Sequence, residues 1–595
     1  MTRPATPEDG ARPETWFPPH ALRQYALLAD GERGAIIGPR GDIGWLCVPS
    51  WHSDAVFASL LGGGGLFAVT PTGRFVWGGY YEDHSLVWRS RWITNDGIIE
   101  CREALAYPAD PDRAVLLRRI VAVDADASLR VVLDVRPGFG TLRPRLRQGG
   151  DGSWLGSAGS WNWRSTGLQS ARPADDGVLQ CQVEVPAREH YDLILEIADG
   201  QLPRLPPDAD RSWQQTEETW RARIPDLDQT CAPRDARHAY AVLYGLTAAS
   251  GGMAAAATTS LPERAEQGRN YDYRYAWIRD ECMAGQALVA ACPSTLFDDQ
   301  VGFVAERVLD DGPDLRPAYT TAGARLPQER TLDLPGYPGG YAVVGNRVNS
   351  QFQLDGLGEA LLLFAAAARA DRLTADARDA AGIAADAIAQ RWREPEAGLW
   401  ELEPRHWTHS RLICVAGLRA ISSALPGPSR RNDWLALSET ILSTTSAQCL
   451  HPSGRWQRAA EDDRVDAALL LPPLRNAVPA DDPRTLATLN AVTQELADDQ
   501  FLYRFRQDSQ QLGDAEGAFL LCGFSMAMAL QHQDRPAEAV RWFERNRAAC
   551  GPAGLFSEEY DVVQRQLRGN LPQAFVHAHL LEASVRLAGP CRPGP

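Results

Sequence analysis

The N-terminal third of the chain alternates apolar and polar residues with a period of two. Leu129, Val131, Leu133 and Val135 alternate with Arg130, Asp134 and Arg136, and the runs 179–185 and 193–197 repeat the same alternation. Asp-Gly turn pairs divide these short runs. Such spacing is typical of antiparallel strands with one buried face. We therefore predict an antiparallel β-sandwich over residues 20–206.

The pattern changes to a helical period after a Pro-rich stretch at 202–207. Residues 207–232 are predicted to form a linker that contains one helix. Beyond it, residues 233–590 contain about twelve helix-like segments of ordinary length. Twelve helices make six hairpins, which predicts an all-α (α/α)6 barrel; a solenoid is the alternative, but no repeat of fixed period is visible. The segments start near Ala236, Asp280, Gln300, Ser350, Thr374, His406, Asn432, Val465, Thr485, Glu516, Pro536 and Pro572.

The composition excludes several classes of function. A net charge of −16 argues against nucleic acid or an anionic membrane as the partner. The sequence contains no Lys, so P-loop, Schiff-base and kinase lysine chemistry are excluded. Its eleven Cys show no CxxC spacing and are interpreted as reduced thiols.

The termini lack targeting signals in the sequence. Residues 1–19 are polar and Pro-rich, and we expect them to form a flexible tail. There is no apolar signal-peptide core and no span of transmembrane length. Together with the reduced cysteines, this predicts a cytoplasmic protein.

The segment 268–280, GRNYDYRYAWIRD, is the strongest chemical signal in the chain. It places aromatic rings, among them Tyr273 and Trp277, directly before the pair Arg279–Asp280. Aromatic faces stack on the C–H faces of a sugar ring, and a fixed Arg/Asp pair can bind its hydroxyl groups. By itself the segment could also be the start of a core helix.

Two later segments place carboxylates beside aromatic residues. Glu401 follows Trp400 after a Gly turn, and Glu558 and Glu559 precede Tyr560. Glycosidic cleavage needs one protonated carboxyl group and one carboxylate, and burial beside an aromatic ring raises the pKa of an acid. For any single acid, a solvated surface carboxylate is the ordinary alternative.

A metal site is the other chemistry that these segments could suggest. His406 and His409 stand at roughly helical spacing, but the sequence offers no evident third ligand. Helix capping or a core hydrogen bond explains this pair better. We expect no metal and no organic cofactor.

Six sequence motifs, which follow one another along the second part of the chain, resemble those of glycoside hydrolase family 15, the glucoamylase, glucodextranase and trehalase group. The N-terminal region from Tyr25 is similar to the trehalase-like domain of bacterial members. The resemblance covers nearly the whole chain. The barrel motifs are GRNYDYRYAWIRD, LPQERTLDLPGYPGG from Leu326, VGNRVNSQFQLDGLGEAL from Val344, GLWELEPRHWTHSR from Gly398, EGAFLLCGF from Glu516 and GLFSEEYDVVQRQLRGNLPQAF from Gly554.

The resemblance implies a role for individual residues. Glu401 aligns with the general acid, and Glu558 aligns with the general base. The family's sugar-binding pair and aromatic walls fall on Arg279, Asp280, Tyr273 and Trp277, and we add Trp400 and Glu559 as expected substrate contacts. Leu402 replaces a sugar-binding Glu of the fungal glucoamylases, and the RG that many bacterial relatives carry between WE and PRH is missing. Both differences affect the aglycone side.

The implied activity is inverting, exo-acting hydrolysis that releases β-D-glucose from the nonreducing end of short α-glucosides. Trehalose and isomalto- or maltooligosaccharides are the candidate substrates, and a small carbohydrate is the expected partner. The alternatives are an inactive carbohydrate-binding barrel and a related helical-barrel lyase or phosphorylase. Loss of either acid would favour the inactive barrel, but Glu401 and Glu558 are both present. A phosphorylase would need a phosphate pocket in place of the base.

Overall fold

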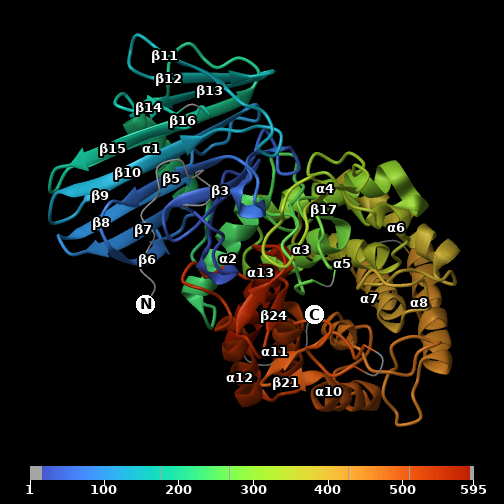
Figure 1. Cartoon of the computed structure of the whole chain (residues 1–595). Coiled ribbons are helices and arrows are strands. Elements are labelled where there is room, and N and C mark those ends of the chain that lie inside the picture. Colours follow the sequence, from blue (N-terminus) through green and yellow to red (C-terminus); the bar gives the residue numbers. More distant parts are fainter. Residues whose placement is uncertain (1–16, 175, 267, 426–427, 508–509, 590–595) are drawn as a thin grey trace.

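The chain folds into a β-sandwich followed by a helical barrel (Figure 1). The structure is a computed structural model, and it describes residues 17–174, 176–266, 268–425, 428–507 and 510–589. The predicted tail lies mostly outside these residues. Phe17 lies inside them, and its side chain is buried against Leu66, Val132 and Val178 of the sandwich. The sandwich therefore includes Phe17, which the predicted boundary at residue 20 left out.

Two eight-stranded antiparallel sheets form the sandwich, which confirms the predicted fold of this region. The first sheet has the order β1-β2-β3-β5-β10-β15-β14, with β4 beside β3; its strands are β1 (Ala26–Ala29), β2 (Gly34–Ile37), β3 (Asp42–Cys47), β4 (Ala55–Phe57), β5 (Leu66–Pro71), β10 (Ala127–Asp134), β14 (Arg172–Pro173) and β15 (Leu179–Val185). The second sheet has the order β11-β12-β13-β16-β9-β8-β7-β6; its strands are β6 (Phe75–Tyr81), β7 (Trp88–Thr94), β8 (Ile98–Leu105), β9 (Arg113–Ala122), β11 (Arg145–Gln148), β12 (Trp154–Ala158), β13 (Trp161–Thr166) and β16 (His190–Asp199).

The alternation in the sequence places the apolar side chains between the two sheets. Leu129 lies opposite Val183, and Val131 lies opposite Cys181, in the register of β10 and β15. Leu129 and Val131 are buried, while Arg130 on the same strand faces solvent. Period-two spacing produces this arrangement because successive side chains point to opposite faces of a strand.

The barrel consists of an inner and an outer ring of helices. The inner helices α3, α5, α7, α9, α11 and α13 contact one another in a closed ring, and the remaining helices pack outside them. This confirms the predicted (α/α)6 barrel. The helices are α2 (Pro233–Leu246), α3 (Ile278–Ala291), α4 (Thr295–Asp311), α5 (Asp355–Arg369), α6 (Ala375–Arg391), α7 (Thr408–Ala424), α8 (Pro428–Gln448), α9 (Leu471–Leu474), α10 (Pro483–Leu496), α11 (Leu520–His532), α12 (Pro536–Arg547) and α13 (Ala574–Ala588).

One predicted helix is much shorter than expected. The segment that starts near Val465 contains only a 3-10 turn, Ala467–Leu470, followed by the four-residue α9. Pro472 and Pro473 occupy this helix, and neither can donate a backbone N–H to a longer helical ladder. Within the described residues, the structure contains no helix with the length and apolarity needed to span a membrane.

The loops of the barrel contain short two- and three-stranded antiparallel sheets. They bring together loops that lead into neighbouring helices. The strands are β17 (Ala276–Trp277) with β18 (Ala318–Tyr319), β19 (Arg330–Thr331) with β20 (Val343–Val344), β21 (Ala497–Asp498) with β22 (Phe501–Leu502), and the sheet of β23 (Ala518–Phe519), β24 (Glu559–Asp561) and β25 (Gln566–Arg568).

The helix α1 (Ala209–Arg223) packs where the sandwich meets the barrel. Its Trp220 ring lies 5.2 Å from the Tyr107 ring of the sandwich and 5.9 Å from the Tyr244 ring of α2. The indole of Trp45 in β3 also donates a hydrogen bond of 3.0 Å to the Ala257 carbonyl of the barrel. The sandwich is therefore fixed against the barrel by buried aromatic and polar contacts.

Candidate active site

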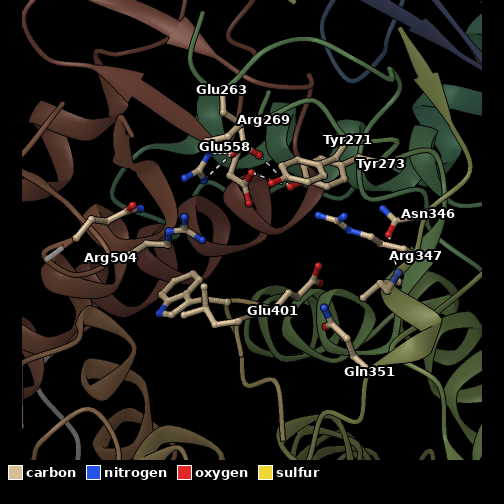
Figure 2. A pocket seen from close by; sticks show the side chains of 14 residues that line it. Glu263, Arg269, Tyr271, Tyr273, Asn346, Arg347, Gln351, Glu401, Arg504 and Glu558 are labelled. Carbon is tan, nitrogen blue, oxygen red and sulfur yellow. Dashed lines mark hydrogen bonds and ion pairs between the residues drawn. The ribbon is translucent and has the colours of Figure 1, made fainter. Parts of the chain in front are cut away.

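A cavity of about 270 Å³ opens among the loops that precede the inner helices. These loops end where α3, α5, α7, α11 and α13 begin, so the cavity lies at the N-terminal end of the inner ring. A second pocket of about 50 Å³ adjoins it and shares five residues with it. The cavity is lined by Glu263, Arg269, Tyr271, Tyr273, Asn346, Arg347, Val348, Gln351, Trp400, Glu401, Leu402, Arg504, Gln507 and Glu558 (Figure 2).

Glu401 lies in a tight loop before α7. Its backbone adopts a left-handed φ of 56°, which is uncommon for a residue with a side chain. The loop is closed by hydrogen bonds from the Glu401 N–H to the Gly398 carbonyl and from the Leu402 N–H to the Ala397 carbonyl. Strained backbone of this kind persists where the surrounding structure imposes it, often at functional sites. Here it directs the carboxylate into the cavity.

One oxygen of the Glu401 carboxylate already has partners. The Trp277 indole N–H donates to Oε1 over 2.7 Å, and Arg279 Nη1 lies 3.5 Å from the same atom. The Glu401 side chain remains 28% exposed, so Oε2 is accessible to a ligand. The sequence motif at 268–280 and the motif at 398–411 therefore meet at this carboxylate.

Glu558 lies across the cavity from Glu401 (Figure 2). It is nearly buried, and the Tyr273 hydroxyl lies 3.2 Å from its Oε2. Burial raises the pKa of Glu558 well above its usual value, and the negative charge of Glu263 adds to the rise, whereas Arg504 and Arg279 oppose it. Glu401 and Glu558 thus stand in different environments within one cavity.

Glu559 does not line the cavity, in contrast to our expectation of a substrate contact. It is the first residue of β24, and its Oε2 accepts a 2.7 Å hydrogen bond from the Gly517 N–H behind the cavity wall. Adjacent residues in an extended segment point to opposite sides, so Glu558 and Glu559 cannot both face the ligand. Glu559 instead holds the loop before α11 in place.

Arg279 and Asp280 lie in the first turn of α3 and border the smaller pocket. Arg279 Nε donates to Asp280 Oδ1 over 2.9 Å, and its Nη1 donates to the Leu399 carbonyl over 2.8 Å. Asp280 Oδ2 is buried and has no hydrogen-bond partner among the described residues. A buried, unpaired carboxylate oxygen beside a pocket can accept a hydrogen bond from a ligand hydroxyl.

Aromatic rings form the walls between the two pockets. Tyr273 and Trp277 meet edge to face with ring centroids 5.6 Å apart, and both border the smaller pocket. Trp400 closes the opposite wall, held by a hydrogen bond of 2.8 Å from its indole N–H to Asp466. Together with Arg279 and Asp280, this arrangement has the aromatic faces and polar groups that a sugar ring requires.

The sandwich supports the aromatic motif from behind. Arg274 is buried and forms a two-pronged ion pair with Asp272, with distances of 2.8 Å. Its Nη1 donates to the Ser53 carbonyl of the sandwich over 2.9 Å and contacts Cys47 Sγ at 3.2 Å. The residue next to Tyr273 is thus anchored to the other domain, which restrains the position of the cavity wall.

Several cavity residues were not predicted from the sequence. Arg504 and Gln507 come from a loop that has no motif of its own, and Arg347 and Gln351 come from the motif before α5. Arg269 lies within the aromatic motif and Glu263 lies shortly before it, so this closeness in sequence was the one available signal. Their roles depend on contacts between distant segments, which spacing alone does not reveal.

One group of possible metal ligands lies outside the cavity. Among the described residues, His190, Asp192 and Asp210 of the sandwich and α1 come close enough to hold an ion. However, Arg119 pairs with Asp192 at 2.7 Å and with Asp210 at 2.6 Å, so a guanidinium already neutralises these carboxylates. None of the three lines the cavity.

Comparison with known proteins assigns the class. Residues 237–585 match the model of the glycosyl hydrolases family 15, and residues 17–220 match the model of the trehalase-like N-terminal domain. The chain is 30% identical to a trehalase of Mycolicibacterium smegmatis over 617 residues, covering 96% of this chain and 91% of that protein. A trehalase of Mycobacterium tuberculosis is also 30% identical, with 96% and 90% covered.

A solved structure shows the same fold over nearly the whole chain. A bacterial glucoamylase in complex with acarbose aligns with a TM-score of 0.72 at 13% identity, covering 96% of each chain. The fold, the cavity and these matches define a glycoside hydrolase. The chain belongs to glycosyl hydrolases family 15.

Proposed function

We propose that this protein is an inverting hydrolase that releases β-D-glucose from the nonreducing end of short α-glucosides, with trehalose as the foremost candidate. The main support is one cavity that contains two carboxylates in unlike environments, Glu401 and Glu558. An inverting glycosidase needs such a pair, one acting as acid and the other as base. The names of the 30% identical relatives favour trehalose within this class.

Glu401 acts as the general acid in this proposal. Trp277 and Arg279 occupy its Oε1, which leaves Oε2 to carry the proton toward the cavity. Oε2 gives this proton to the glycosidic oxygen as the bond to the anomeric carbon breaks. The leaving sugar departs as an alcohol, and the carboxyl group becomes a carboxylate.

Glu558 acts as the general base from the opposite wall. It takes a proton from a water molecule while the water oxygen forms the new bond to the anomeric carbon. Attack on the face opposite the leaving group inverts the configuration, so an α-glucoside gives β-glucose. The proton gained by Glu558 returns to solvent after the product leaves, and Glu401 takes up a new proton.

The smaller pocket binds the nonreducing glucose in this proposal. Asp280 offers its unpaired Oδ2 to the sugar hydroxyls, and Arg279 holds Asp280 and the Leu399 carbonyl in position. Tyr273 and Trp277 stack beside the ring. The cavity of about 270 Å³ and the adjoining pocket of about 50 Å³ are together close to the lower end of the usual volume range for ligand sites, about 300–1,000 Å³. A combined volume of this size suits a short substrate.

A substrate panel tests the proposal. We expect kcat/KM to be highest for trehalose among trehalose, maltose, isomaltose, kojibiose and soluble starch. A steady rise with the length of maltooligosaccharides would contradict the short-substrate assignment. Formation of glucose 1-phosphate in phosphate buffer would identify a phosphorylase, and binding without turnover of any sugar would identify an inactive barrel.

A further inference from the structure

A second buried carboxylate, that of Glu263, stands beside the proposed base. Its side chain is 3% exposed and lines the same cavity, yet the mechanism above does not use it. Glu263 Oε1 lies 3.2 Å from the Tyr273 hydroxyl, and Glu558 Oε2 lies 3.2 Å from the same hydroxyl. Figure 2 shows the three side chains converging on one side of the cavity.

The phenol between the two carboxylates has a single proton. Burial raises the pKa of Tyr273 well above its usual value, and the charges of Glu558 and Glu263 raise it further, so the hydroxyl stays protonated. It can donate to Glu263 or to Glu558, or be shared between them. The hydrogen bond from Tyr273 to Glu263 therefore competes with the one from Tyr273 to Glu558.

Cations near this cluster are paired mainly with carboxylates other than Glu558. Arg269 donates to Glu263 Oε2 from Nε over 2.9 Å and from Nη2 over 2.7 Å. Arg504 pairs with Glu516 at 2.6 Å, and Arg279 pairs with Asp280. Within the described chain, Glu558 has no ion-pair partner. It faces Glu263 and Tyr273 at close range, with Glu401 across the cavity.

The local backbone holds Glu263 against the base. The Glu263 N–H donates to the Arg269 carbonyl, which closes the loop 263–269, and the Gly569 N–H donates to the Pro262 carbonyl. Gly569 adopts a φ of 85°, and a Cβ built there would lie 3.4 Å from Glu263 Cγ and 3.9 Å from Glu558 Cβ. Both side chains thus pack over the same glycine, and a side chain at this position would press against them.

We propose that Glu263 is a positioning residue for the catalytic base: its charge strengthens Glu558 as a proton acceptor, and its contact with Tyr273 fixes the hydroxyl that both carboxylates share. This inference rests on the proposed role of Glu558. A negative neighbour disfavours ionisation of a carboxylate and so raises its proton affinity. A stronger base removes a proton from water more readily, as long as it is ionised at the working pH.

The test is the pH dependence of kcat/KM in Glu263→Gln. The amide keeps the shape of the side chain and removes the charge. Because the charge of Glu263 raises the pKa of Glu558, its removal lowers that pKa, and the acid limb of the profile should move to lower pH. We expect the plateau kcat to fall about three- to tenfold as the base weakens, with little change in KM.

Two further variants separate charge from structure. Glu266→Gln changes an exposed glutamate of the same loop and should leave the profile unchanged. Glu263→Asp keeps the charge, so its acid limb should stay at the wild-type position even if kcat falls. An acid limb that moves in Glu263→Asp as it does in Glu263→Gln would contradict a charge effect.

Other results would overturn the inference in distinguishable ways. A wild-type profile and kcat in Glu263→Gln would show that Glu263 does not act on the base. A loss in Glu263→Gln as deep as that in Glu558→Gln would make Glu263 itself the base. Wild-type-like turnover in Glu558→Gln would refute the proposed function itself, which the Glu263 profile alone cannot do.

Discussion

Buried carboxylates differ between the sandwich and the barrel in whether they have an ion-pair partner. In the described part of the sandwich, each buried carboxylate lies within ion-pair distance of a basic side chain. Arg118 and Glu103, both fully buried, are 2.6 Å apart, and Arg118 also donates to two backbone carbonyls. The other pairs are Asp30–Arg33, Asp42–His20, Glu100–Arg89, Asp134–Arg136 and Glu196–Arg164.

The barrel contains buried carboxylates without such partners. Asp355, Glu359, Glu396 and Glu558 have no ion pair within the described chain, although all are buried. Burial raises the pKa of Asp355 to about 6, that of Glu359 to about 7 and that of Glu396 to about 8. A buried carboxylate that is paired with a basic side chain can have a purely structural role. Carboxylates whose pKa values are perturbed cluster at functional sites. Of these four carboxylates, Glu558 lines the cavity, which lies in the barrel.

The largest effect is expected from removing either cavity carboxylate. Glu401→Gln and Glu558→Gln should each lower kcat by at least about 10²–10⁴-fold, because general acid or base assistance is lost. Both amides keep the side-chain shape, so the melting temperature should stay near that of the wild type. Steady-state kinetics with thermal unfolding in parallel checks this, and near-normal turnover in either variant would remove that residue from the mechanism.

The sandwich should respond in the opposite way. Glu103→Gln leaves the guanidinium of Arg118 buried without its counter-charge, which typically costs about 3–5 kcal/mol in the free energy of unfolding. The folded enzyme should keep its kcat, since neither residue lines the cavity.

The control for this variant is Glu439→Gln, which removes an exposed partner of Arg419 and should cost less than about 1 kcal/mol. Urea unfolding measures both. Equal destabilisation by the two substitutions would show that the buried pair has no special weight.

The smallest effect, taken per pH unit, concerns the pH dependence of stability. Glu396 lies before the loop of Glu401, and burial together with Asp355 raises its pKa from 4.5 to about 8. The folded protein therefore holds a proton that the unfolded chain releases, so stability falls as pH rises from about 4.5 to about 8. Glu396→Gln should make this fall shallower by up to about 1.4 kcal/mol per pH unit.

Urea unfolding at several pH values between 5 and 8 checks the slope. Glu394→Gln, at a more exposed neighbouring glutamate paired with Arg391, provides the control and should match the wild type. An unchanged slope in Glu396→Gln would mean that Glu396 is ionised in the folded protein, against the comparison drawn above.

Much of the fold could be predicted because it follows from local periodicity. The alternation of apolar and polar residues predicted the sandwich. Helical spacing and capping residues predicted most helix starts to within a few residues, such as Thr374, which caps α6. The helix near Val465 was wrong in length because Pro472 and Pro473 override the apolar pattern. The cavity and the adjoining smaller pocket together bring in the residues that the motifs suggested, while the roles of these residues remain predictions: Tyr273, Trp277, Arg279, Asp280, Trp400, Glu401 and Glu558.

The rest of the site depends on tertiary contacts. Arg504 reaches the cavity from a loop more than 200 residues after Tyr273, and no spacing rule connects them. Glu263 acquires its importance only when the loop 263–269 folds beside Glu558. Glu559 was misplaced because two adjacent acids were treated alike, although a strand directs them to opposite sides.

The anomeric form of the first glucose released tests the central claim most directly. Proton NMR of trehalose hydrolysis, recorded before mutarotation equilibrates the sugar, separates the α and β anomeric signals. Because each trehalose also yields the leaving glucose as the α form, inversion predicts equal initial amounts of β- and α-glucose. Release of α-glucose alone would indicate retention of configuration and would contradict the roles of Glu401 and Glu558 as acid and base.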